Sequence, residues 1–140
     1  MRRECSIRGL NYRAPRSSLV ICPMCGRART RKTRHGVCRV CTVRIATRRT
    51  KTMIALELAA TTPEFRRSHS HLLEPVEARA NPRMRPLMPR TAGMRPDERQ
   101  RAVDEHDAAV ERAELEEAMN EYAAVRMRLH RLRAALRSDR

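Results

Sequence analysis

The last third of the chain has the most regular hydrophobic pattern. Apolar residues follow one another there at steps of three and four over about three heptads, the spacing of one helix face. No Gly or Pro interrupts residues 97–140, and Pro96, Asp97 and Glu98 suit the first turn of a helix. We therefore predict one long amphipathic helix over residues 97–140. Its apolar seam consists of Leu115, Ala118, Tyr122, Val125, Leu129, Leu132 and Leu136.

This seam is long enough for a coiled coil, so we expect the helix to form a homodimer or to pair with a helical protein partner. A homodimer is expected to be antiparallel, because acidic residues outnumber basic ones in residues 97–121 and basic residues outnumber acidic ones in residues 126–140. The alternative is a helix that packs on its own amino-terminal module. Upstream of Leu115, the same phase would place Arg101, Asp104 and Glu111 inside. We therefore expect the seam not to extend upstream to these residues.

Two further elements are predicted in the first half of the chain. Residues 17–21 become β-branched and apolar toward their end, which favours a strand. Residues 42–60 contain neither Gly nor Pro and have apolar residues at near-helical spacing, which favours a helix. These apolar residues are Val43, Ala46, Met53, Ile54 and Leu58.

Proline dominates residues 61–96, which contain six of the eight prolines of the chain. Such a density blocks helix interiors and sheet ladders and favours an extended chain. Leu72 and Leu73 can support a short helical turn between Pro63 and Pro75. Otherwise the segment is predicted to be a linker. The chain is thus expected to have three parts, at residues 1–60, 61–96 and 97–140.

Charge is distributed unevenly over these parts. The net charge is +15, and residues 1–60 hold fifteen of the 31 Lys and Arg but only two of the 16 Asp and Glu. Nearly all the basic residues are arginine, whose fork binds phosphate at two points, so the first part is expected to bind a polyanion. Aromatic residues make up only 2% of the chain. A metal and a helix seam must therefore supply stability that a large core would otherwise provide.

Four cysteines have the spacing C-x2-C-x12-C-x2-C and are expected to bind one Zn²⁺. A disulfide framework is the alternative, but no secretory leader is recognisable and no segment approaches the roughly eighteen apolar residues that span a bilayer. We expect a cytoplasmic protein with reduced thiols. Four thiolates leave no open coordination position, so the zinc is expected to be structural and the protein not to be an enzyme. The ligands are Cys22, Cys25, Cys38 and Cys41.

The second cysteine pair directly precedes the helix predicted at residues 42–60. A cysteine turn, a loop and a ligand-bearing helix form the treble-clef arrangement, which we favour over a zinc ribbon. The fold class expected is therefore a small zinc-stabilised α-rich (α+β) module of treble-clef type, followed by a Pro-rich linker and a long C-terminal helix. Cys5 is expected to be a free thiol.

The runs CPMCGR at residues 22–27 and GVCRVC at residues 36–41, followed by Arg44 and Ala46, resemble a known family. This is the zinc-binding form of the fourteenth protein of the small ribosomal subunit, and the similarity covers about residues 20–47. The resemblance implies that the four cysteines bind zinc and that the module binds RNA. It also implies that three arginines contact phosphate, namely Arg27, Arg39 and Arg44.

The loop between the cysteine pairs and the helix after it are densely basic. Two or three cations would offset the charge of a zinc–thiolate centre, so the remaining cations are predicted to bind phosphate, in duplex DNA or structured RNA. The scarcity of aromatic residues argues against stacking on single strands. The predicted nucleic-acid-binding residues are Arg27, Arg29, Arg31, Lys32, Arg34, Arg39, Arg44, Arg48, Arg49 and Lys51.

Two other functions remain open from the sequence. The basic surface could instead dock an acidic protein, which would make this chain a zinc-stabilised adaptor. A nuclease of the HNH type is the third hypothesis, because His69 and His71 precede Glu74 and Asn81. The proline-rich context disfavours the hairpin that such a nuclease needs.

Overall fold

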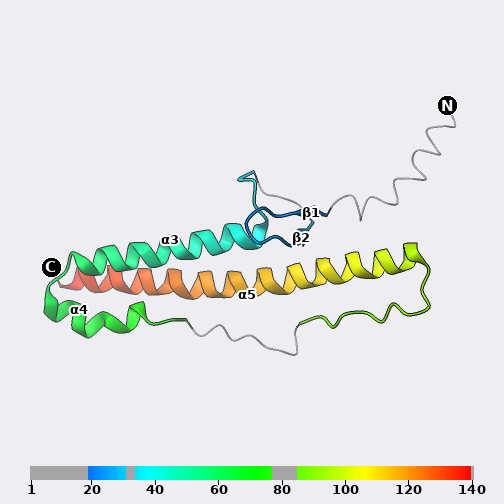
Figure 1. Cartoon of the computed structure of the whole chain (residues 1–140). Helices are drawn as coiled ribbons and strands as arrows, with labels where there is room; N and C mark the ends of the chain where they lie inside the picture. Colours follow the sequence, from blue (N-terminus) through cyan, green and yellow to red (C-terminus); the bar gives the residue numbers. More distant parts are fainter. Residues whose placement is uncertain (1–18, 31–33, 77–84, 140) are drawn as a thin grey trace. The chain divides into compact units, whose positions relative to one another are not determined.

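A computed structural model describes residues 19–30, 34–76 and 85–139 of the chain. Its elements are β1 (Val20–Ile21), β2 (Ala28–Arg29), α3 (Arg39–Ala59), α4 (Pro63–His69), the 3₁₀ helix η1 (Ser70–Leu73) and α5 (Pro96–Ser138) (Figure 1). The helices predicted at residues 42–60 and 97–140 are confirmed as α3 and α5, and the α-rich fold class is confirmed with them.

The chain divides into two compact units. The first unit comprises Met1–Cys41 and Asn81–Glu114, and the second comprises Thr42–Ala80 and Leu115–Arg140. Each unit therefore contains part of α5, which differs from the three consecutive parts expected from charge. The difference arises because residues distant in sequence pack together in each unit, and composition along the chain does not report such contacts.

In the first unit, β1 and β2 form a short antiparallel hairpin. Val20 pairs with Arg29, and Ile21 pairs with Ala28. The hairpin places Cys22 directly after β1, at the start of the turn. Gly26 lies in this turn with a φ of 70°, a left-handed conformation that a residue with a side chain adopts only at a cost.

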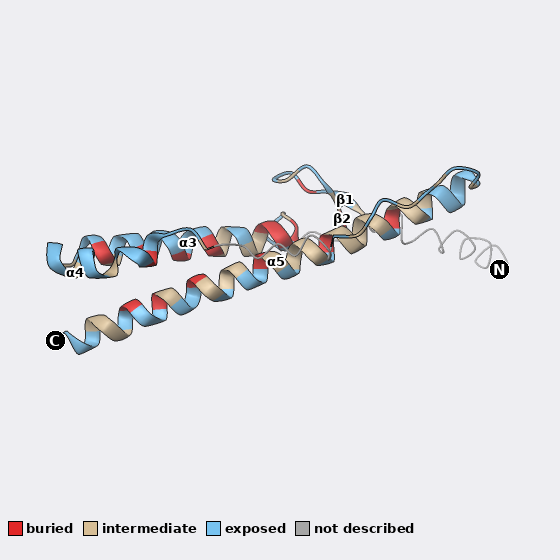
Figure 2. Cartoon of the chain, turned by 90° about the horizontal axis from the view of Figure 1, so that it is seen from below, coloured by how far each residue is buried: buried red, intermediate tan, exposed pale blue. Residues whose placement is uncertain are grey.

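In the second unit, apolar side chains of three elements form the core. Ile54 and Leu58 of α3 pack with Leu72 of η1, and all three are buried. The seam of α5 completes the core, and buried positions recur along that helix (Figure 2). Its contributing residues are Val125, Leu129 and Leu132. Within this unit α3 and α5 run parallel, as Figure 1 shows.

A short helix and a 3₁₀ turn lie within the proline-rich segment. Pro63 occupies the first turn of α4, and the Thr62 side chain caps that helix by accepting a hydrogen bond from the N–H of Phe65. The short helical turn predicted before Pro75 is thus confirmed. This turn contributes to the core of the second unit, because Leu72 of η1 is buried there.

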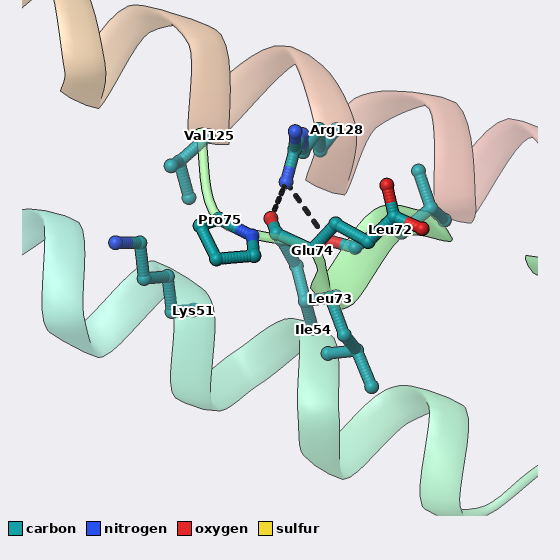
Figure 3. A pocket seen from close by; sticks show the side chains of 8 residues that line it. All are labelled: Lys51, Ile54, Leu72, Leu73, Glu74, Pro75, Val125 and Arg128. Atoms are coloured by element: carbon teal, nitrogen blue, oxygen red, sulfur yellow. Dashed lines mark hydrogen bonds between the residues drawn. The ribbon is translucent and has the colours of Figure 1, made fainter. Parts of the chain in front are cut away.

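Polar contacts of α5 surround this core. Arg128 donates hydrogen bonds to the backbone carbonyls of Leu72 and Glu74, where η1 ends (Figure 3). A cavity of about 200 Å³ lies beside these contacts, with Ile54 and Val125 in its wall. Lys51, at the same cavity, pairs with Glu121 across the two helices, at an N–O distance of 2.8 Å.

None of the helices in the part of the chain that the structure describes is both long and apolar enough to cross a membrane.

Candidate functional site

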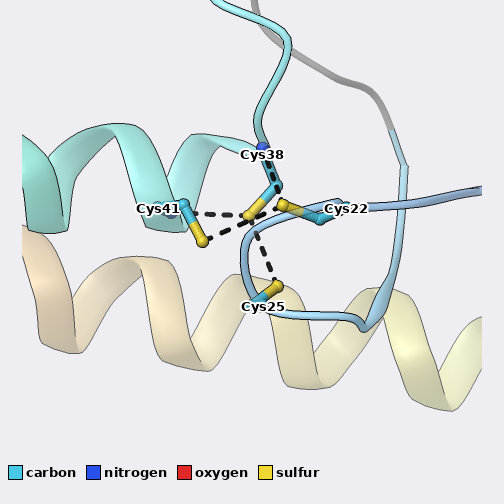
Figure 4. A group of neighbouring side chains, drawn as sticks. All are labelled: Cys22, Cys25, Cys38 and Cys41. Atoms are coloured by element: carbon cyan, nitrogen blue, oxygen red, sulfur yellow. Dashed lines mark hydrogen bonds between the residues drawn. The ribbon is translucent and has the colours of Figure 1, made fainter.

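The first cysteine pair is held by the turn of the β-hairpin. The N–H of Cys22 donates to the carbonyl of Arg27 at 3.0 Å, and the N–H of Gly26 donates to the carbonyl of Cys22 at 2.8 Å. These bonds close the loop that contains Cys25. Both sulfurs consequently point to the same side of the loop, toward the second pair (Figure 4).

The second cysteine pair lies at the beginning of α3. Cys38 directly precedes the helix, and its Sγ accepts a hydrogen bond from the N–H of Cys41 at 3.4 Å, as an N-cap side chain does. The N–H of Cys38 in turn donates to Sγ of Cys22 at 3.4 Å. A helix amino terminus stabilises negative charge, so the N–H of Cys41 opposes the rise that burial causes in the pKa of Cys38 without cancelling it.

The four sulfurs form one compact cluster. All lie within 4.8 Å of one another, and the Cys22–Cys41 and Cys25–Cys38 Sγ distances are both 3.9 Å. Sulfurs at 2.3 Å from a tetrahedral zinc would be about 3.8 Å apart. A disulfide would require about 2.05 Å, and the four cysteines are free thiols. The cluster can therefore hold one metal ion.

The thiols differ in acidity. Burial raises the pKa of Cys22, but the N–H groups of Cys25, Cys38 and Met24 more than offset this and bring it to about 6. Burial together with the adjacent Cys38 thiol raises the pKa of Cys41 to about 12. Four thiolates this close repel one another, so they can all ionise together only around a cation.

Two acids of α5 contact the hairpin in the first unit. The Glu114 carboxylate forms ion pairs with Arg27 and Arg29, one to each oxygen. Glu111 accepts hydrogen bonds from the N–H and the hydroxyl of Thr30, at 2.9 and 3.0 Å. Glu111 is only 4% exposed. Sequence analysis missed both acids.

The periodicity of the seam contained a signal for one of them. The phase of the seam places Asp104 and Glu111 inside, where the sequence predicts that the seam stops, yet the side chains of Asp104 and Glu111 are buried. The buried face of the helix therefore continues upstream of the apolar seam. In that part its buried residues are acids that contact polar groups. Arg101, which the same phase would place inside, is exposed and pairs with Asp97.

The predicted phosphate-binding residues have different environments. Arg29 is 1% exposed and paired with Glu114, so it has no surface for a phosphate and is removed from the predicted set. Arg27 and Lys51 remain partly exposed but pair with Glu114 and Glu121. Arg31 and Lys32 lie outside the described residues. The other five arginines are exposed, namely Arg34, Arg39, Arg44, Arg48 and Arg49.

The seam predicted to mediate self-association is covered within the chain. Val125, Leu129 and Leu132 are buried in the core of the second unit, and Leu136 packs against that core. Ala118 is also buried, whereas Leu115 and Tyr122 are half-buried. The seam is thus an intrachain interface, and its burial needs no second copy.

The histidines of the nuclease hypothesis lie on the second unit. The His69 ring stacks on Phe65 with centroids 4.0 Å apart, and its Nδ1 lies 3.0 Å from the carbonyl of the same residue. His71 is exposed, and Asn81 lies outside the described residues. Over residues 19–30, 34–76 and 85–139, the four cysteines are the one cluster of three or more potential metal ligands.

Comparison with known proteins found no matching family model, no similar curated protein and no similar solved structure. The similarity to the ribosomal family therefore rests on the cysteine runs alone. The arrangement of the four sulfurs supports a metal site without supporting membership of that family.

Proposed function

We propose that the four cysteines hold one structural zinc ion in a module of treble-clef type. The observation that supports this is the close spacing of four sulfurs supplied by a hairpin turn and a helix start. Four thiolates are one of the usual ligand sets of structural zinc sites. Four protein ligands leave no position for water, so the metal would stabilise the fold without taking part in a reaction.

We further propose that the module presents α3 to a nucleic acid. The single observation that carries this proposal is a group of three exposed arginines within α3, Arg44, Arg48 and Arg49, none of which forms an ion pair within the described residues. Arg44 and Arg48 are four residues apart on the helix, where like charges repel and cost a few tenths of a kcal/mol. Phosphate groups would relieve this repulsion.

The pairing of two acids in the second unit also supports α3 as the binding surface. The one acid of α3, Glu57, lies near its carboxyl end and pairs with Arg133 of α5 at 2.7 Å. Glu121 pairs with Lys51. Glu57 and Glu121 are therefore already paired with Arg133 and Lys51. The positive charge of the arginines nearer the amino end of α3 is not balanced by these two acids. With few aromatic side chains to stack on bases, duplex DNA or structured RNA is the expected target.

The test replaces Arg44, Arg48 and Arg49 together with Gln and measures binding to duplex DNA, structured RNA and heparin over a range of salt. We expect weaker binding to both nucleic acids and a salt dependence that is flatter by up to about three phosphate contacts. The matched control replaces three exposed arginines dispersed along α5, Arg99, Arg112 and Arg131, with the same change in net charge.

Equal losses in the two triple variants would mean that net charge, and not the α3 surface, determines binding. No binding to any polyanion by the wild-type protein would favour the adaptor hypothesis, in which the same surface docks an acidic protein. A pull-down before and after nuclease treatment would then separate a nucleic-acid partner from a protein partner.

A further inference from the structure

Arg29 connects the metal centre to α5. Its side chain is 1% exposed, and one terminal nitrogen, Nη2, lies 3.7 Å from Sγ of Cys25 and also donates to Glu114. The guanidinium therefore bridges a metal ligand and a carboxylate that is 89 positions later in the sequence. Groups of this kind, hydrogen-bonded to metal ligands, orient those ligands and tune metal affinity.

The adjacent contacts extend this connection along the helix. Thr30 follows Arg29 and donates two hydrogen bonds to Glu111, one turn before Glu114. Arg27 pairs with the second oxygen of the Glu114 carboxylate. Strand β2 and its flanks thus contact one face of α5 through ion pairs and hydrogen bonds.

Between residues 96 and 114, no apolar residue of α5 is fully buried. Within residues 96–114, the buried residues are Asp104 and Glu111, and the first buried apolar residue of the helix is Ala118. Asp104 accepts a hydrogen bond from Gln100, one turn earlier in the same helix. The polar contacts of Glu111 and Glu114 with the hairpin therefore link this segment to the metal centre.

We propose that Arg29 and Glu114 are positioning residues of the metal centre and that metal binding orders residues 105–114 of α5 through them. The metal fixes Cys25 and the hairpin turn, which fixes Arg29 and Thr30, and these residues hold Glu114 and Glu111. Glu114 in return holds Arg29 against Sγ of Cys25. The inference rests on the metal centre proposed above and is independent of nucleic-acid binding.

The first experiment compares Glu114→Gln with Glu116→Gln in the full chain. Both variants remove one negative charge from α5, but Glu116 is exposed. We expect Glu114→Gln to lower the affinity for zinc by about tenfold or more, measured by competition with a chelator, and the control to match the wild type. With Co²⁺ as a probe, the thiolate-to-metal charge-transfer bands should also shift in Glu114→Gln alone.

The second experiment follows amide hydrogen exchange with and without zinc. Exchange of residues 105–114 should slow when zinc binds to the wild-type chain, and this slowing should be much smaller in Glu114→Gln. Arg29→Lys keeps the charge but loses the planar fork, so it should show the same two defects.

Two results would overturn the inference. One is equal zinc affinity and equal Co²⁺ spectra for Glu114→Gln and Glu116→Gln. The other is exchange at residues 105–114 that does not respond to zinc while exchange at residues 22–41 does. Failure of the wild-type chain to bind any metal would instead refute the metal centre itself, and a loss of nucleic-acid binding would affect neither measurement.

Discussion

At the scale of single residues, the four thiols differ in pKa in the metal-free chain. Cys22 and Cys25 receive N–H donors and have lowered pKa values, although burial opposes this. Burial raises the pKa of Cys38 and of Cys41. At neutral pH the second pair therefore retains its protons, and a metal must displace them to bind four thiolates.

We accordingly expect zinc binding to release at least two protons near neutral pH, those of Cys38 and Cys41, and its apparent affinity to rise at least about 100-fold per pH unit there. The sign follows from the raised pKa values: groups protonated in the metal-free chain lose protons on binding, so lower pH weakens the complex. A zinc titration in weak buffer with a pH indicator counts the protons. An affinity that does not change with pH would contradict the expected ionisation of Cys38 and Cys41.

The ligands were accessible to sequence analysis, whereas their supporting residues were not. A C-x2-C pair specifies its own turn locally, so spacing sufficed to select Cys22, Cys25, Cys38 and Cys41. Glu111 and Glu114 acquire their role only from the hairpin that contacts them. From sequence, an acid in an apolar phase indicates the end of a seam, and Arg29 is indistinguishable from the other arginines of its loop.

At the scale of elements, the helices were predictable and their partners were not. The α5 seam has the period of a helix face in any packing, so it predicts burial without identifying what covers it. Here Leu72 of η1 and two residues of α3 cover it. The proline-rich composition around η1 favours a linker. The Thr62 cap and Pro63, which begin α4, are only two residues, too few to change the composition of the segment.

The intrachain seam predicts a stability effect that depends on the face of the helix. Leu132 is 0% exposed, so Leu132→Ala should lower the free energy of unfolding of the second unit by about 2–5 kcal/mol. Met127, on another face of α5, is 51% exposed, and Met127→Ala should change it by less than about 0.5 kcal/mol.

Urea unfolding followed by circular dichroism compares these two variants. Equal and small effects would show that the seam is not buried in the chain. A urea midpoint that rises with protein concentration in the wild type would instead support the self-association predicted from the sequence, provided that this concentration dependence is lost in Leu132→Ala.

At the scale of the whole molecule, the two units have different sources of stability. The first unit has the sulfur cluster and the acid contacts of Glu111 and Glu114. The second has an apolar core to which α3, η1 and α5 contribute. Since α3 and α5 each pass through both units, the units share helices while their stabilising contacts remain distinct.

Loss of the metal should therefore unfold one unit and spare the other. In Cys41→Ser, or after chelation, we expect amide protection to disappear at residues 22–30, 34–41 and 105–114, because the contacts that hold them depend on the cluster. Protection at Ile54, Leu58, Val125 and Leu132 should persist, because their core contains no cysteine. Hydrogen exchange with mass spectrometry separates the two regions in one sample. A single cooperative loss of protection over the whole chain would contradict this independence and would mean that the shared helices transmit unfolding from the metal centre to the apolar core.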